Sequence, residues 1–130
     1  PKGSSVDYKL ELMCVPVSDV DRAKTFYVDQ VGFTADHDHR VTESLRFVQL
    51  TPPGSGCSIS IGEGLTTMAP GSLEGLQLVV EDADAAYAEL SARGVEVGDG
   101  PEDLPWGRFV YFKDPDGNKW NIQQPVRPAG

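Results

Sequence analysis

The 130-residue sequence repeats one short pattern at an offset of about 63 positions, and this repeat constrains the fold more than any other feature. In each copy, an apolar stretch typical of a strand is followed by an aspartate, a helical pattern and then a glycine. The aligned pairs are Val17 with Val80, Asp19 with Asp82, Asp21 with Asp84, and Ala23 with Ala86. Such self-similarity predicts an internal duplication.

The two helices are predicted over Val20–Gln30 and Ala83–Arg93, where apolar residues recur at three- and four-residue spacing. Each follows an aspartate, whose carboxylate accepts hydrogen bonds from the free amides of a first helical turn. Each also ends at a glycine, which provides a C-terminal stop. The aspartates are Asp19 and Asp82, and the glycines are Gly32 and Gly94.

Short apolar or alternating stretches predict four strands in each half. In the first half they are Tyr8–Val17, Phe33–Asp36, Leu45–Leu50 and Cys57–Ile61, and in the second Leu76–Val80, Val95–Val97, Phe109–Phe112 and Lys119–Gln123. The segment Asp114–Asn118 has the proline and glycine of a tight hairpin connection.

Each half is therefore predicted to be a βαβββ module. A module of this size buries too little apolar surface to be stable alone, so the two halves are expected to pack as one structural domain. The expected division is an N-terminal tail at 1–7, a first module at 8–61, a linker at 62–74, a second module at 75–125 and a C-terminal tail at 126–130.

The composition narrows the classes of partner. With 20 acidic and 11 basic residues, the net charge of −9 repels phosphate backbones and anionic lipid surfaces, which argues against nucleic acid or membrane binding. No apolar segment approaches membrane-spanning length, and no signal peptide is recognisable, so a cytoplasmic protein is expected. The two cysteines, Cys14 and Cys57, are expected to be reduced thiols.

Three segments of the sequence, taken together with the distances between them, resemble the vicinal oxygen chelate superfamily. This superfamily includes glyoxalase I, extradiol dioxygenases, and fosfomycin- and bleomycin-resistance proteins. The segments are Val17–Tyr27, Val31–Phe33 and Phe112–Asn118, and the resemblance covers roughly residues 8 to 125. It implies an α+β fold in which two βαβββ modules form an open, curved barrel around a ligand hollow, with helices outside. It leaves open whether the modules pair within one chain or between two chains.

Metal-using members of that superfamily take four ligands from strands of both modules. The resemblance carries these positions onto Leu12, Gly75, Asn121 and either Ser60 or Ser58, depending on the strand register. None of these side chains is a carboxylate or an imidazole, the donors that divalent metals prefer. We therefore expect no metal and no cofactor, and catalysis through a metal is doubtful.

Side chains on the expected strands predict a neutral, partly aromatic pocket. Strand alternation places Phe112 and Trp120 in the core, and Phe109 and Tyr111 toward the hollow, with Trp106 in the preceding loop. The remaining expected ligand-binding residues are Leu12, Cys14, Ser58, Ser60, Asn121 and Gln123. A pocket of this kind suits recognition of a small molecule better than acid–base chemistry.

His37 and His39 are the only histidines, and they alternate with Asp36 and Asp38 at the end of an expected strand. Such a polar group is typical of a solvated strand end. A surface metal clip and contact with a ligand of a partner subunit are the alternatives.

The sequence thus favours a metal-free protein of the bleomycin-resistance type, which sequesters an apolar or aromatic ligand as a homodimer and has an antibiotic-resistance role. The alternatives are a glyoxalase-like lyase or isomerase with unrecognised ligands, a metal-independent enzyme, and an interaction module without a ligand.

Overall fold

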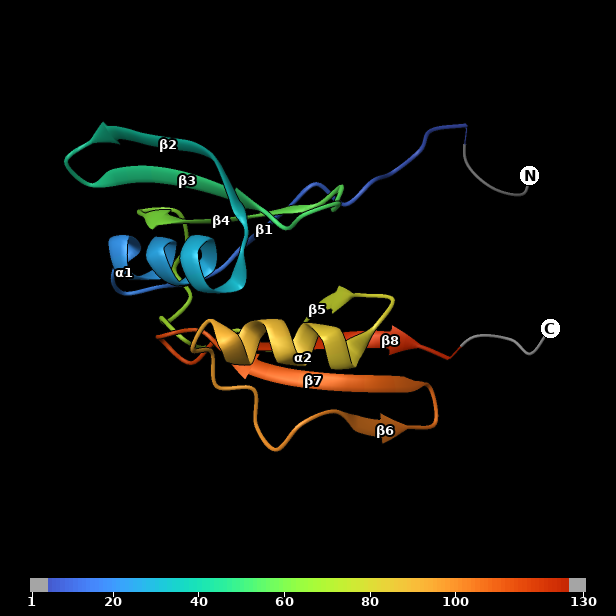
Figure 1. Ribbon diagram of the computed structural model, residues 1–130. Helices are drawn as coiled ribbons and strands as arrows, with labels where there is room; N and C mark the ends of the chain where they lie inside the picture. Colours follow the sequence, from blue (N-terminus) through green and yellow to red (C-terminus); the bar gives the residue numbers. More distant parts are fainter. Residues whose placement is uncertain (1–4, 127–130) are drawn as a thin grey trace.

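The computed structural model describes residues 5–126, which form two four-stranded sheets, each with one helical segment (Figure 1). The first module contains β1 (Leu12–Cys14), α1 (Val20–Thr25), the π-helical η1 (Phe26–Val31), β2 (Thr34–Thr42), β3 (Leu45–Thr51) and β4 (Ser58–Glu63). The second contains β5 (Leu76–Val79), α2 (Ala83–Ala92), β6 (Glu102–Leu104), β7 (Gly107–Lys113) and β8 (Lys119–Pro125).

The two sheets have the same topology. Their strand orders are β1-β4-β3-β2 and β5-β8-β7-β6, with β1–β4 and β5–β8 parallel and every other pair antiparallel. Within residues 5–126 neither sheet closes into a barrel. The predicted fold class, two βαβββ modules of an open α+β fold, is confirmed.

Both helical segments begin where the sequence predicts and end within one residue of the predicted end. The carboxylates of Asp19 and Asp82 accept hydrogen bonds from the backbone amides of Arg22 and Ala85, at 3.0 Å each. In the first module the α-helix continues as η1, whose wider turns bury the consecutive residues Phe26 and Tyr27. Gly32, in the left-handed conformation at φ 98°, ends this segment.

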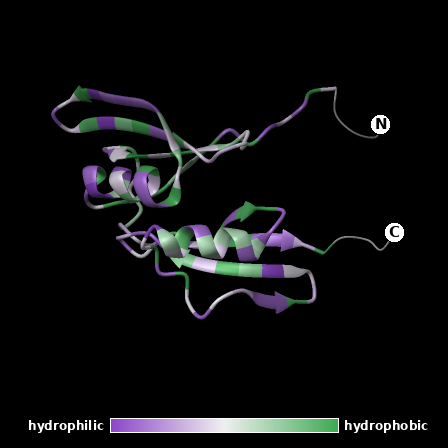
Figure 2. Cartoon of the chain, viewed as in Figure 1, coloured by the Kyte–Doolittle hydropathy of each residue, from purple (hydrophilic) through white to green (hydrophobic). Residues whose placement is uncertain are grey.

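Each helix covers one face of its own sheet, and the modules meet across these helix-bearing faces. β3 contains both hydrophobic and hydrophilic residues (Figure 2). Burial alternates along its last four residues, so that Val48 and Leu50 face the core and Gln49 and Thr51 are only partly buried. Across the module boundary, the Tyr27 ring lies 5.7 Å from that of Trp120, and Phe26 lies 6.2 Å from Phe112. The core positions predicted for Phe112 and Trp120 are confirmed.

The Asp114–Asn118 turn links the modules through buried hydrogen bonds. The Tyr27 hydroxyl donates to Asp114 Oδ2 at 2.7 Å and accepts from Trp120 Nε1 at 2.9 Å. Asn118 Nδ2 donates to the Pro16 carbonyl at 2.8 Å, and Asn118 Oδ1 accepts from the Leu73 amide at 3.1 Å. Burial and the neighbouring Asp114 raise the pKa of the Tyr27 hydroxyl, which therefore stays protonated. We refer to the six residues joined by these hydrogen bonds as the clasp: Pro16, Tyr27, Leu73, Asp114, Asn118 and Trp120.

Three strand predictions need correction. The first strand is not Tyr8–Val17, because only Leu12–Cys14 pairs with β4 as a strand. The second is longer than Phe33–Asp36 and runs from Thr34 to Thr42, since pairing with β3 carries it through its polar residues. Val95 and Val97 are buried, but the segment Val95–Val97 forms no strand. The strand there is β6, a polar edge strand without an apolar signal.

The predicted tails lie partly outside the described residues, at 1–4 and 127–130. β4 continues to Glu63, two residues past the predicted end of the first module. No helix within residues 5–126 is long and apolar enough to cross a membrane.

Candidate functional site

Each sheet has one face that its own helix does not cover, and we call these the first and second open faces. Strand alternation and register place on the first open face Leu12, Cys14, His37, His39, Phe47, Gln49, Thr51, Ser58 and Ser60. The second open face contains Gln77, Val79, Glu102, Phe109, Tyr111, Asn121 and Gln123. The residues predicted on strands to line the hollow thus fall into two groups, one on each sheet.

Aromatic rings form a ladder on the second open face. The Phe109 and Tyr111 rings are stacked, with centroids 6.1 Å apart and 12° between their planes. Trp106, in the turn between β6 and β7, packs edge-on to Phe109 at 6.5 Å. Trp106 is 61% exposed and Tyr111 42%, whereas Phe109 is 5% exposed. The ladder therefore presents two accessible aromatic surfaces on a buried support.

Amide side chains surround this ladder. Gln77 Nε2 donates to Gln123 Oε1 at 2.6 Å, and Gln123 Nε2 donates to the Trp106 carbonyl at 3.1 Å, which fixes the turn that holds Trp106. Asn121 lies between Gln77 and Tyr111 on adjacent strands. Desolvation and, secondarily, the Glu102 carboxylate raise the pKa of Tyr111, so its hydroxyl stays neutral.

The polar residues of the first open face form a hydrogen-bonded chain. The Thr51 hydroxyl donates to the Asp36 carboxylate, Ser58 Oγ lies 2.6 Å from Thr51 Oγ1, and Gln49 Nε2 donates to Ser58 Oγ at 3.4 Å. Asp36 reaches this face because the register of β2 shifts between Ala35 and His37. Sequence reasoning missed Gln49, Thr51 and Gln77, because a single polar residue on a half-buried strand gives no distinctive signal.

His37 and His39 lie within β2 and not at a strand end. Their rings are stacked at 5.7 Å, and their strand partners are Gln49 and Phe47 on the first open face. The aspartate between them points to the other face, where Asp38 binds Lys24 and Arg46. The histidine pair is thus part of the same surface as Leu12 and Ser58.

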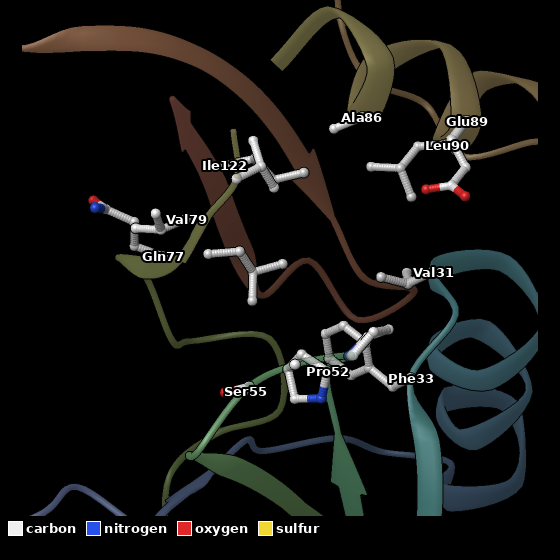
Figure 3. A pocket seen from close by; sticks show the side chains of 14 residues that line it. Val31, Phe33, Pro52, Ser55, Gln77, Val79, Ala86, Glu89, Leu90 and Ile122 are labelled. Atoms are coloured by element: carbon white, nitrogen blue, oxygen red, sulfur yellow. The ribbon is translucent and has the colours of Figure 1, made fainter. Parts of the chain in front are cut away.

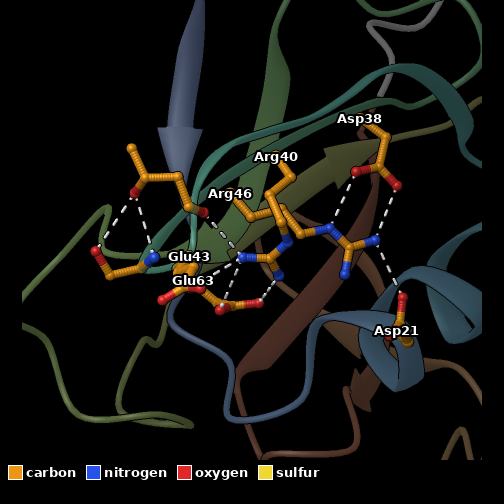
Figure 4. Close-up of polar contacts among 8 residues, drawn as sticks. Asp21, Asp38, Arg40, Glu43, Arg46 and Glu63 are labelled. Carbon is orange, nitrogen blue, oxygen red and sulfur yellow. Dashed lines mark hydrogen bonds and ion pairs between the residues drawn. The ribbon is translucent and has the colours of Figure 1, made fainter.

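Ion pairs gather on the helix-bearing side of the first sheet (Figure 4). Arg46 NH2 lies 2.9 Å from Asp38 and 3.0 Å from Asp21, and Arg40 NH2 lies 2.6 Å from Glu63. The hydrogen bonds from Arg46 and Lys24 hold the pKa of Asp38 well below its usual range. These arginines therefore contribute no charge directly to the first open face.

A cavity of about 560 Å³ lies between the modules, and its lining includes Gln77 and Val79 of β5 (Figure 3). Val31, Phe33 and Pro52 of the first module line one side, and Leu90 of α2 and Ile122 of β8 line the other. The sequence analysis did not anticipate it, because its walls come from residues distant in the chain. It contains none of the predicted ligand-binding residues.

The model of the Glyoxalase/Bleomycin resistance protein/Dioxygenase superfamily matches residues 9–122. The chain belongs to this superfamily. The predicted resemblance is thereby confirmed.

Several solved structures of the superfamily are similar to the chain. One is TnmS3, an antibiotic binding protein from Streptomyces sp. CB03234, with 43% identity and a TM-score of 0.83, covering 95% of this chain and all of that one. A glyoxalase/bleomycin resistance protein from the same strain has 45% identity and a TM-score of 0.78, covering 89% of this chain and 100% of that one.

The chain is also similar in sequence to an uncharacterised protein of Bacillus subtilis, YetH. The two are 30% identical over 86% of this chain and 94% of the length of YetH.

In this member of the superfamily, the positions carried over as metal ligands do not offer a suitable donor set. Leu12 has no donor atom, Ser58 and Ser60 are neutral hydroxyls, and Asn121 is a neutral amide. Gly75 precedes β5, and the β5 partner of Asn121 is Gln77. Across residues 5–126, no three side chains of His, Cys, Asp or Glu are grouped suitably for a metal. We derive no chemistry through a metal for this site.

Proposed function

We propose that this chain binds and sequesters a small apolar or aromatic molecule on its open faces, and that it does so without catalysis. The observation that carries the proposal is the ladder of Trp106, Phe109 and Tyr111 on the second open face. Rigid aromatic surfaces with a few neutral polar groups beside them are typical of small-molecule sites.

The similarity to an antibiotic binding protein supports the binding role. That similarity extends over 95% of this chain at 43% identity, so it includes both modules and both open faces. By analogy, we propose an antibiotic or a chemically similar organic compound as the class of ligand.

We further propose that two copies of the chain complete the pocket. The modules pack through their helix-bearing faces, so neither open face is covered by the other module. Leu12 on the first face and Val79 and Tyr111 on the second remain 38%, 66% and 42% exposed. Exposed apolar residues on one surface favour a partner, and a second copy would place a first open face opposite a second open face.

Native mass spectrometry of the untagged protein tests this proposal in one experiment. We expect a dimer without a divalent metal, with the mass of any retained organic ligand added. A stoichiometric transition metal would contradict the proposal and favour a glyoxalase-like enzyme. Consumption of a bound compound by the metal-free protein would favour a metal-independent enzyme instead.

Substitutions in the ladder test the location of the site. Trp106→Ala and Tyr111→Ala should each weaken binding of an aromatic ligand about tenfold or more, because each removes an accessible ring surface. Isothermal titration calorimetry measures this, with Met68→Ala in the exposed linker as the matched control. Unchanged affinity in both ladder variants would place the site elsewhere, with the inter-module cavity as the next candidate.

A further inference from the structure

We propose that both open faces recognise hydrogen-bond donors of the ligand, so that the preferred ligand is an aromatic compound bearing O–H or N–H groups. This inference rests on the proposed binding function and specifies the chemistry that the same site selects. It follows from the hydrogen bonds that polar side chains of the two faces already make within the protein, and from the buried acceptor that these bonds leave without a partner.

On the second open face, the buried polar atom that lacks a partner is an acceptor. Asn121 Oδ1 is buried, and it is the one such side-chain nitrogen or oxygen within residues 5–126 without a hydrogen-bond partner. An unsatisfied buried acceptor costs roughly 1–3 kcal/mol, so a donor that reaches it gains affinity. The neighbouring amides do not donate to it in the observed arrangement, where Gln77 donates to Gln123 and Gln123 donates to the Trp106 carbonyl.

Asn121 is also placed beside the aromatic ladder. Its strand partner on β7 is Tyr111, whose ring is stacked on Phe109. A planar ligand lying against Tyr111 would therefore have its edge close to Asn121 Oδ1. A hydroxyl or N–H group on that edge would pair with the free oxygen, whereas an ether or carbonyl oxygen would face it unfavourably.

On the first open face, the hydrogen-bonded chain has only one consistent direction. A carboxylate accepts and does not donate, so the Thr51 hydroxyl hydrogen is committed to Asp36. Thr51 Oγ1 must then accept from the Ser58 hydroxyl, and Ser58 Oγ accepts from Gln49 Nε2. The Ser58 hydroxyl hydrogen is thus already donated to Thr51 Oγ1. Toward a ligand, Ser58 Oγ can therefore act only as a hydrogen-bond acceptor.

The two faces therefore agree, although they belong to different sheets and share no residue. Each has a buried acceptor, Asn121 Oδ1 on one and Ser58 Oγ on the other. A ligand held between a first and a second open face would pair best if it carried a donor toward each. Hydroxylated or amino-substituted aromatic compounds meet this requirement, whereas hydrocarbons and fully alkylated ethers of the same shape do not.

A pair of probes that differ at one group tests the inference. Binding of 1-naphthol and of 1-methoxynaphthalene to the full chain is measured by isothermal titration calorimetry. We expect 1-naphthol to bind about tenfold more tightly, the equivalent of about one buried hydrogen bond. If the two probes bind with equal affinity, the donor selectivity is overturned but the binding function stands. If neither probe binds up to its solubility limit, both the donor selectivity and the proposed binding function are overturned.

Three variants locate the selectivity. Asn121→Leu removes the free acceptor and should lower the affinity for 1-naphthol about tenfold, with the affinity for 1-methoxynaphthalene changed less than about twofold. Asn121→Asp retains an acceptor and should preserve the preference. Thr51→Val frees the Ser58 hydroxyl to donate, so the advantage of 1-naphthol should shrink.

Thr67→Val, an exposed threonine of the linker, is the matched control for Thr51→Val and should leave both affinities unchanged. Thermal unfolding of every variant establishes that it is folded at the temperature of the titration. The assignment of these acceptors would be contradicted if Asn121→Leu lost affinity equally for both probes. It would also be contradicted if Asn121→Leu and Thr51→Val both kept the wild-type preference for 1-naphthol.

Discussion

The Tyr27 hydroxyl belongs to one module but is satisfied entirely by the other, since it donates to Asp114 and accepts from Trp120. Tyr27→Phe should lower the free energy of unfolding by about 1–3 kcal/mol, because both partners lose a buried hydrogen bond. Urea denaturation followed by circular dichroism measures this. Tyr87→Phe is the control, because Tyr87 is half-buried on α2 and takes no part in the clasp. Equal losses in the two variants would show that the clasp hydroxyl has no special role.

Asp38 makes stability depend on pH in a defined direction. Its pKa in the folded protein is lowered by Arg46 and Lys24, so the unfolded chain takes up the proton first as the pH falls. The stabilisation is therefore fully present above roughly pH 4, the ordinary range of an aspartate, and is lost progressively below it. The difference in unfolding free energy between wild type and Asp38→Asn should be larger at pH 7 than at pH 3. A difference that does not shrink in acid would contradict this role.

At the scale of the secondary-structure elements, the hairpin turn between β7 and β8 contributes to module packing through Asn118. Asn118 is fully buried, and its side chain bonds the Pro16 carbonyl and the Leu73 amide outside its own hairpin. Asn118→Ala should destabilise the protein by about 3 kcal/mol, because it leaves two buried backbone groups unpaired. Asp99→Ala, in the exposed turn after α2, should change stability by less than about 0.5 kcal/mol. Denaturant titration compares the two, and a similar small effect in both would refute the turn's proposed contribution.

The elements that the sequence predicted best are those with local signals. Both helices were recognisable from their aspartate caps, their periodicity and their terminal glycines, which act within a few residues. β2 and β6 were misjudged because their pairing partner, and not their own composition, makes them strands. Alternation predicted that Ser58 and Asn121 lie side by side in one hollow, whereas the two residues belong to different sheets. The polar chain through Asp36 depends on a register shift in β2, and such a shift has no reliable signal in a single sequence.

At the scale of the whole molecule, the exposed open faces predict self-association. Light scattering after size-exclusion chromatography should give twice the 14.0 kDa mass of one chain at micromolar concentration. Tyr111→Glu should shift the population toward the monomer, because it introduces a charge on the surface expected to face the partner. Asp99→Glu is the charge-neutral control outside that surface. A wild-type protein that remains at the mass of one chain would contradict the shared pocket.

The clasp and the open faces have no hydrogen bond in common, because the clasp is built on the helix-bearing side of the sheets. Substitutions on the two surfaces should therefore act on stability almost independently. The effects of substitutions at Tyr111, Asn121 or Ser58 should therefore add to those of substitutions in the clasp, with little coupling between the two groups. The surface that each sheet leaves open can thus change in sequence without altering the contacts that hold the two modules together.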